Sequence, residues 1–180
     1  MVSPFTTDLR KISRRCAIIP EAEAGPIGIK ERRVAVVGIG NELRGDDIAG
    51  LLVIREAGKR VESPGILFLE AGPAPENCTG SLRKFRPDWV IFVDAAEMGA
   101  PPGEVRWLDP LETTGYSAST HTLPLHVLSD YISSEIGCRV SLLGIQPAHT
   151  DFDSPPSQAI RAAVARAAGE LIRYLPGQIS

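Results

Sequence analysis

Three acidic side chains and one histidine stand at places in the sequence where they could bind a cation. Asp46 and Asp47 are adjacent in the segment RRVAVVGIGNELRGDDIAGL. Asp94 ends the apolar run WVIFVD, and His121 lies in the segment STHTLPL. Two carboxylates and one imidazole leave coordination positions open, and they suit a divalent transition metal better than calcium.

Apolar runs before these residues predict strands that bring them to one edge of a sheet. The acidic pair follows a buried strand over Val34–Gly38 and precedes a helix over Asp47–Lys59. Asp94 directly follows a second buried strand over Trp89–Val93. Because ligands bind at the carboxyl ends of strands in open α/β sheets, we expect these strands to be neighbours and the acids to share that edge. His121 belongs to the same edge, since it immediately precedes a predicted helix.

The loop that carries the acidic pair nearly matches two phosphate-binding motifs. Gly38 and Gly40 begin a dinucleotide fingerprint, but the third glycine is replaced by Leu43. Gly40 and Gly45 have the spacing of a phosphate loop, yet two aspartates stand where Lys-Ser/Thr should follow. A phosphate needs cationic charge beside the backbone amides, and this loop supplies two anions. The pattern therefore favours a cation and disfavours a nucleotide-binding protein.

Each candidate side chain also has an ordinary structural explanation. An aspartate at a helix N-terminus caps backbone amides, which explains one member of the acidic pair more readily than both. Asp94 could cap a turn, and His121 could be a solvated loop histidine. His126 lies on another face of its helix, and His149 falls in the loop PAHTDFD, which we expect to be exposed. Convergence on one edge favours the functional interpretation of Asp47, Asp94 and His121.

Composition limits the class of protein. The chain has 180 residues, 43% of them hydrophobic, which is enough for one domain with a full core. A net charge of -3 does not indicate a nucleic-acid partner, and no apolar run approaches the roughly 20 residues of a membrane span. Cys16, Cys78 and Cys138 are isolated, which predicts neither disulfides nor a thiolate metal site and fits a reducing cytoplasm. The apolar run after Arg14-Arg15 is too short for an export signal, so we expect a cytoplasmic protein.

The rest of the chain alternates strands and helices. This order predicts a doubly wound, mostly parallel sheet with helices on both faces, a three-layer α/β sandwich formed by residues 32–176. Further strands are expected over Ile66–Glu70, Val105–Leu108 at an edge, and Val140–Ile145. Further helices are expected over Gly80–Phe85, from an N-cap at Thr122 with Pro124 in the first turn to Ile136, and over Ala159–Leu175.

Residues 1–31 look like an extension of this domain. Leu9, Ile12, Cys16 and Ile19 recur at helical spacing, which predicts a short amphipathic helix, and a linker follows it. The helix could pack on its own domain, mediate dimerisation or contact a partner, and packing on the domain is favoured. The protein is expected to be a monomer or a homodimer.

Five segments together resemble the hydrogenase maturation endopeptidases, which process the large subunit of nickel–iron hydrogenases. They are GIGNELRGDDIAG at 38–50, EAGPAPEN at 70–77, VDAAEMGAPPGE at 93–104, STHTLPL at 119–125 and LGIQP at 143–147. The last four are most similar to the branch that processes hydrogenase 3 type large subunits. The likeness extends from about Val34 to Leu175 and leaves out only the N-terminal extension.

The resemblance implies a nickel-recognition site formed by Asp47, Asp94 and His121, the same residues that the sheet-edge argument selects. The implied substrate is a large-subunit precursor that already holds nickel, from which the endopeptidase removes a C-terminal peptide. Nickel would therefore be supplied by the substrate, and no tightly bound metal of the protein's own is expected. The resemblance also implies substrate binding by residues of the matched loops: Gly40, Asn41, Asp46, Gly72 and Pro73.

Two positions depart from the family pattern. Ile48 follows the acidic pair where the family often has glycine, which changes the flexibility of the loop. The second strand ends in Glu70-Ala71-Gly72 where Asp-Gly-Gly is common, and this puts a role for Glu70 in doubt.

The sequence leaves mechanism and function class partly open. Water activated by the metal could attack the peptide bond. A metal-free aspartic mechanism would instead require Asp47 and Asp94 almost in contact, and it gives His121 no evident task. A non-enzymatic metal-sensing or chaperone module of the same fold is the alternative function, because it would need the same ligands.

Overall fold

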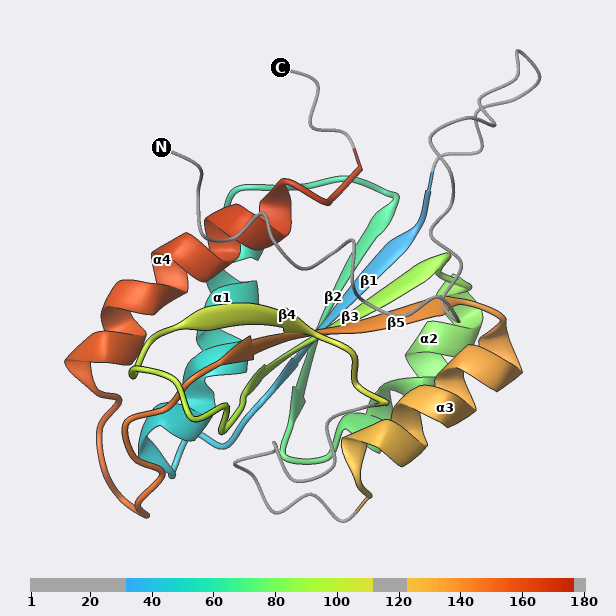
Figure 1. Ribbon diagram of the computed structural model, residues 1–180. Helices are drawn as coiled ribbons and strands as arrows, with labels where there is room; N and C mark the ends of the chain where they lie inside the picture. The colour runs from blue at the N-terminus through green and yellow to red at the C-terminus, as the bar shows by residue number, and fades with distance from the viewer. Residues whose placement is uncertain (1–31, 112–122, 177–180) are drawn as a thin grey trace.

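Strands and helices alternate along residues 32–111 and 123–176, the part of the chain that the structure, a computed structural model, describes (Figure 1). The strands are β1 (Val34–Ile39), β2 (Ile66–Gly72), β3 (Trp89–Ala95), β4 (Val105–Leu108) and β5 (Arg139–Ile145). The α-helices are α1 (Ala49–Gly58), α2 (Thr79–Phe85), α3 (Leu125–Ile136) and α4 (Gln158–Ile172). Two single-turn 3-10 helices, η2 (Gly45–Ile48) and η3 (Pro75–Cys78), lead into α1 and α2. The predicted helix of the N-terminal extension lies outside the described residues.

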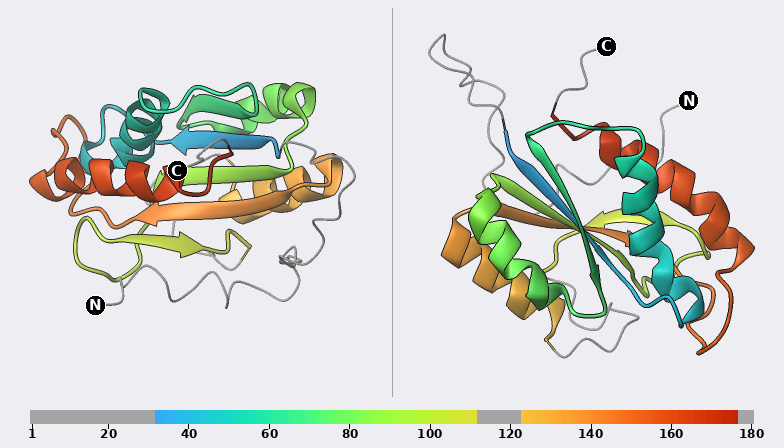
Figure 2. Two further views of the ribbon diagram at one scale, coloured as in Figure 1. Left: turned by 90° about the horizontal axis from the view of Figure 1, so that it is seen from above. Right: turned by 180° about the vertical axis from the view of Figure 1, so that it is seen from behind.

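The strands form one sheet in the order β2-β1-β3-β5-β4, which can be followed from top to bottom in the left view of Figure 2. β1 is parallel to both β2 and β3, and β3 is parallel to β5. β4 is antiparallel to β5 and ends the sheet, as predicted for an edge strand. The expected pairing of the first and third strands is confirmed, with Gly38 opposite Val93 in the register.

Helices cover both faces of the sheet. α1 and α4 pack on one face, and α2 and α3 pack on the other (Figure 1). The two sides of β1 and β3 contribute to different cores: Val36 and Ile91 face α1 and α4, whereas Val37 and Phe92 face α2 and α3. Burial on both sides explains why these strands read as continuous apolar runs. The predicted three-layer, mostly parallel α/β fold is therefore confirmed.

Two helices begin later than the sequence predicts. The helix expected from Asp47 starts as the 3-10 turn η2 and becomes α-helical at Ala49. The helix expected from Thr122 begins at Leu125, and its N-cap is Pro124, whose ψ of 137° is extended. A proline disfavours helical geometry in the residue before it, so Leu123 cannot extend the helix backwards. The prediction of Thr122 as the N-cap is therefore wrong.

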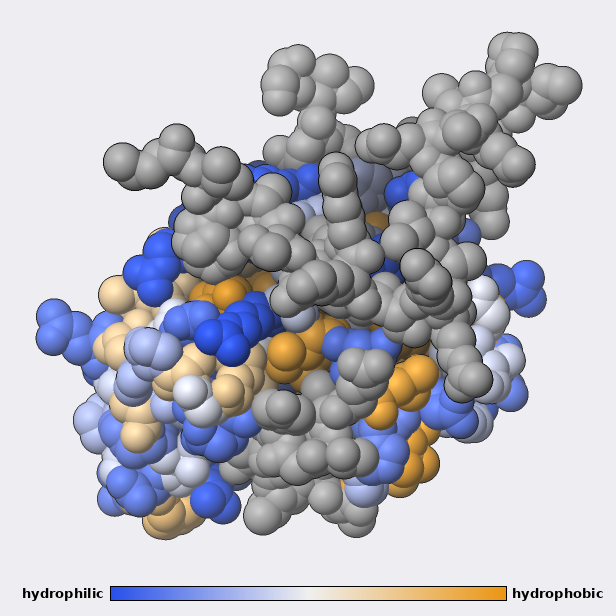
Figure 3. Space-filling view, in the orientation of Figure 1, coloured by the Kyte–Doolittle hydropathy of each residue, from blue (hydrophilic) through white to orange (hydrophobic). Residues whose placement is uncertain are grey.

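The surface of the described residues is mixed in polarity. Figure 3 shows hydrophilic side chains over much of the α4 side and hydrophobic ones nearer the centre and right.

Within residues 32–111 and 123–176, none of the helices has the length and apolar character that crossing a bilayer requires.

Candidate active site at the carboxyl edge of the sheet

Close packing of a helix on two strand ends brings Asp47 to the edge that carries Asp94. A Cβ atom on Gly50 would lie 2.1 Å from the carbonyl oxygen of Val93 and 2.3 Å from that of Ile39. The start of α1 therefore rests directly on the carboxyl ends of β3 and β1. Asp47 lies in η2, three residues before Gly50, and η2 contacts β3, the strand that contains Asp94.

Both carboxylates are withdrawn from solvent. Asp47 has 0% of its surface exposed and Asp94 has 1%. Two carboxyl groups at one edge of the sheet can supply oxygen ligands to a divalent cation. The third predicted ligand, His121, lies outside the described residues, so the convergence of the three side chains stays a prediction. Among residues 32–111 and 123–176 alone, no group of three His, Cys, Asp or Glu side chains is arranged to hold a metal ion.

Four of the predicted substrate-binding residues lie in two loops that hydrogen bonds join beside Asp47. The amide of Gly40 donates a hydrogen bond of 3.0 Å to the carbonyl oxygen of Gly72, and exposed Pro73 follows. The amide of Asn41 donates to the carbonyl oxygen of Asp47 at 3.3 Å. Gly40 has φ +149°, and a Cβ there would lie 2.1 Å from the Asp47 carbonyl oxygen, so no other residue fits. The structure thus brings these loops together, and their contact with substrate stays a prediction.

The Asp46 carboxylate joins two loops inside the protein. It accepts hydrogen bonds from the amide of Ala148 at 2.7 Å and from the amide and hydroxyl of Ser157 at 2.6 and 2.8 Å. Ser157 is the N-cap of α4, where its hydroxyl accepts from the amide of Ile160. Asp46 is 0% exposed and makes no side-chain cap on η2. Its role is therefore to fasten the β1–α1 loop to the β5–α4 loop, and its carboxylate presents no surface to a substrate.

We expect Asp46→Asn to lower the free energy of unfolding by about 2–3 kcal/mol. The amide nitrogen of asparagine would face N–H and O–H donors that now meet a carboxylate oxygen. Urea unfolding followed by circular dichroism measures this loss. The matched control is Asp151→Asn in the same pair of loops, whose side chain is 80% exposed, and it should change stability by less than about 0.5 kcal/mol. Equal stability of the two variants would contradict the assignment.

A buried glutamine supports the loop that leaves β3 after Asp94. Gln146 is 3% exposed, and its side-chain oxygen accepts hydrogen bonds from the amides of Met98 and Ala100 at 2.7 and 3.2 Å. Its side-chain nitrogen donates to Glu97 at 2.7 Å. Gln146 belongs to the LGIQP segment. This segment therefore stabilises the loop that follows Asp94.

The other histidines and the described cysteines do not join the site. His149 is half-buried, and its ring lies against Gly45: a Cβ atom added to Gly45 would be 2.7 Å from the His149 Nδ1. The prediction that the loop of His149 is exposed is therefore only partly correct. His126 lies on α3 and is half-buried. Burial raises the pKa of the Cys78 thiol, and it raises that of Cys138 to about 11. Both thiols are therefore protonated near neutral pH, which disfavours either of them as a nucleophile.

Glu70 takes part in an ion pair outside the site. Its two carboxylate oxygens accept hydrogen bonds from Arg55 at 3.1 and 2.6 Å, and Arg55 also bonds Glu42 at 2.6 Å. The hydrogen bond from Arg55 lowers the pKa of Glu70. Glu70 lies in one of the two segments that depart from the family pattern. In this structure it is an ion-pair partner on the surface.

Comparison with known proteins identifies the family. The model of a family described as hydrogenase maturation protease, HycI, matches residues 51–174. The chain is 37% identical over 127 residues to the hydrogenase 3 maturation protease of Escherichia coli K12, which covers 70% of this chain and 80% of that protein.

Solved structures agree with this result. The NiFe hydrogenase maturation protease HycI from Thermococcus kodakarensis superposes with a TM-score of 0.73 at 38% identity, covering 81% of this chain and 93% of that one. The solution structure of the endopeptidase HycI from Escherichia coli gives a TM-score of 0.70 at 34% identity, covering 79% and 90% of the two chains. With its acidic edge and its matched loops in place on the same fold, this chain belongs to the hydrogenase maturation protease family.

Proposed function

We propose that this protein is an endopeptidase that removes a C-terminal peptide from the nickel-loaded precursor of a nickel–iron hydrogenase large subunit. The observation that carries the proposal is the pair of buried carboxylates, Asp47 and Asp94, at the carboxyl edge of a fold shared with maturation proteases. The relatives reported above are named as proteases or endopeptidases, which supports an enzyme over a metal-sensing or chaperone module.

In this proposal nickel belongs to the substrate. Asp47 and Asp94 would supply two oxygen ligands to it, and His121 would supply a nitrogen ligand. Carboxylates and one imidazole do not select nickel over other divalent metals, whose affinities follow a general order. Selectivity would therefore come from the precursor, and the protein would need no tightly bound metal of its own.

Burial of the two acids gives them a defined chemical setting. Charges act more strongly on one another where water is excluded than at the surface. A divalent ion presented by the precursor would be attracted to this edge, and water bound to that ion would be more acidic than bulk water. Because neither acid is exposed, the precursor must displace part of the surrounding edge to reach them.

The cytoplasm is the proposed compartment, because isolated cysteines without a pairing motif fit a reducing environment. A monomer or a homodimer is the proposed acting form. The partner is the large-subunit precursor, and neither a nucleic acid nor a membrane is required.

We expect incubation with a nickel-loaded large-subunit precursor to shorten that precursor at its C-terminus. Intact-mass spectrometry measures the loss, and sequencing the released peptide gives the cleavage position. The same precursor prepared without nickel is the control, and it should stay intact. Equal cleavage of both forms would overturn the nickel requirement, and cleavage of neither would overturn the proposed activity.

A further inference from the structure

Two loops beside the candidate site are joined along their backbones. Residues 43–46 run alongside residues 149–154 through three hydrogen bonds between main-chain atoms: Asp153 N to Leu43 O at 2.8 Å, Gly45 N to Ser154 O at 3.1 Å, and Asp46 N to His149 O at 3.1 Å. The Arg44 side chain adds a bond of 3.3 Å to the carbonyl oxygen of Thr150, and the Asp46 carboxylate adds those described above. The loops lie next to each other at the lower left of Figure 1. These bonds therefore join the two loops into one unit.

This unit holds two large apolar side chains in solvent. Leu43 is 56% exposed, and Phe152 is 72% exposed, the highest value among the large exposed hydrophobic residues that the structure describes. The bond from Asp153 to Leu43 makes the two residues close neighbours, since Phe152 directly precedes Asp153. Asp153 has φ +56°, a left-handed conformation that is uncommon for a residue other than glycine. Backbone strain and several hydrogen bonds thus maintain an arrangement that leaves apolar surface in water.

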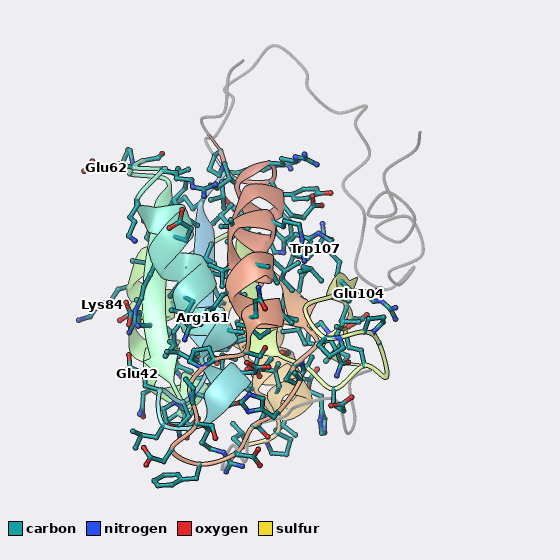
Figure 4. The ribbon with its side chains drawn as sticks, turned by 90° about the vertical axis from the view of Figure 1, so that its left-hand side faces the viewer. Glu42, Glu62, Lys84, Glu104, Trp107 and Arg161 are labelled. Atoms are coloured by element: carbon teal, nitrogen blue, oxygen red, sulfur yellow. The ribbon has the colours of Figure 1, made fainter. Side chains whose placement is uncertain are left out.

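Acidic side chains flank Phe152. Asp151 precedes it and has a side chain 80% exposed, whereas Glu42, which precedes Leu43, is paired with Arg55 at 2.6 Å. Asp153 is also exposed. Glu42 is labelled in Figure 4, on the lower part of the molecule, and Arg161 marks the first turns of α4 above the joined loops. An apolar centre within an acidic border fits a partner surface with an apolar centre and a basic border.

We propose that Leu43 and Phe152, bordered by Asp151 and Asp153, form a docking surface for the hydrogenase large-subunit precursor. We name it the 43/152 surface. The inference rests on the proposed function, and it adds that the precursor contacts the protease through apolar side chains flanked by lysine or arginine. The surface lies on the segment that leads to the site, because Leu43 precedes Asp47 by four residues.

A second copy of this chain is a poorer occupant of the same surface. A symmetric dimer through the 43/152 surface would bring two acidic borders together, and like charges across an interface cost free energy. A precursor bound there would instead be held beside the acids while the nickel is recognised.

The test compares processing kinetics of the nickel-loaded precursor by four proteins: the wild type, Leu43→Ser/Phe152→Ser, Asp151→Lys, and Val127→Ser. We expect the double variant to raise KM about tenfold or more while kcat changes less than roughly threefold. Asp151→Lys should also raise KM, and the rise should shrink as salt is added. Val127→Ser is the matched control, because Val127 is 43% exposed on α3, and its KM should be unchanged.

The possible outcomes distinguish a failure of the docking proposal from a failure of the proposed function. If the wild type cleaves the precursor and the double variant keeps its KM, the 43/152 surface is not a docking site. If the double variant alters the protein's mass in sedimentation while KM is unchanged, the surface joins two copies of the chain and the proposal is wrong. If the wild type fails to cleave any nickel-loaded precursor, the proposed function itself fails. Thermal unfolding confirms that the variants are folded, and Asp151→Lys tests the border if the double variant is not.

Discussion

We expect Asp47→Asn to lower processing of a nickel-loaded large-subunit precursor by more than about a hundredfold. Changing a residue that only supports a metal ligand costs about 10–100-fold, so loss of a ligand charge should cost more. Asparagine keeps the shape of the side chain and removes the negative charge that balances a cation. Asparagine adds no bulk at this fully buried position, so the variant should have room to fold. Intact-mass spectrometry of the precursor measures processing, and circular dichroism checks the fold.

The adjacent acid provides the matched control. Asp46 and Asp47 are both 0% exposed, but the Asp46 carboxylate binds the β5–α4 loop. Asp46→Asn should therefore lower stability yet keep processing per folded molecule within about tenfold of the wild type, measured at a temperature where it is folded. A folded but inactive Asp46→Asn together with an active Asp47→Asn would reverse the assignment within the pair.

Sequence periodicity was sufficient to predict the sheet. Apolar runs of the right length at Val34 and Trp89 identified two buried strands, and the handedness of parallel connections limits how such strands can be arranged. Their pairing was predicted from these apolar runs and their acidic carboxyl ends, and the structure confirms it. The start of α3 could not be predicted in the same way, because Thr122 and Pro124 both carry helix-start signals. The restriction that a proline places on its predecessor decides between them.

The candidate site shows where sequence reasoning ends. Burial distinguishes Asp47 from a solvated cap, and no local pattern reports burial. The partners of Asp46 lie more than 100 residues away, so the sequence leaves its role open between a cap and a loop contact. Ser157 before the last helical pattern is an N-cap signal that was available, but its second bond to Asp46 depends on tertiary structure.

Glycines at close contacts are the hardest of these features to predict. In the sequence, Gly38 and Gly40 belong to near matches of phosphate-binding motifs. In the structure Gly38 instead allows α1 to approach β1, since a Cβ there would lie 2.8 Å from the carbonyl oxygen of Gly50. Gly50 makes the matching approach from the helix. This contact between helix and strand fixes the position of η2, and with it the position of Asp47 relative to Asp94.

Gly50→Ala should therefore lower the free energy of unfolding by about 3 kcal/mol or more, because overpacking against the backbone forces the helix or the strands to move. The added methyl group would lie 2.1 and 2.3 Å from two backbone carbonyl oxygens, which cannot turn aside as a flexible side chain can. Urea unfolding measures the loss, and processing of the precursor should fall as well, since η2 must shift away from β3. Gly58→Ala is the matched control in the same helix: its Cβ would meet only Phe68 at 3.8 Å, so it should leave stability unchanged or raise it by up to about 1 kcal/mol. If both substitutions have the same effect on stability, the close approach at Gly50 is not what holds the acidic loop on the carboxyl ends of β1 and β3.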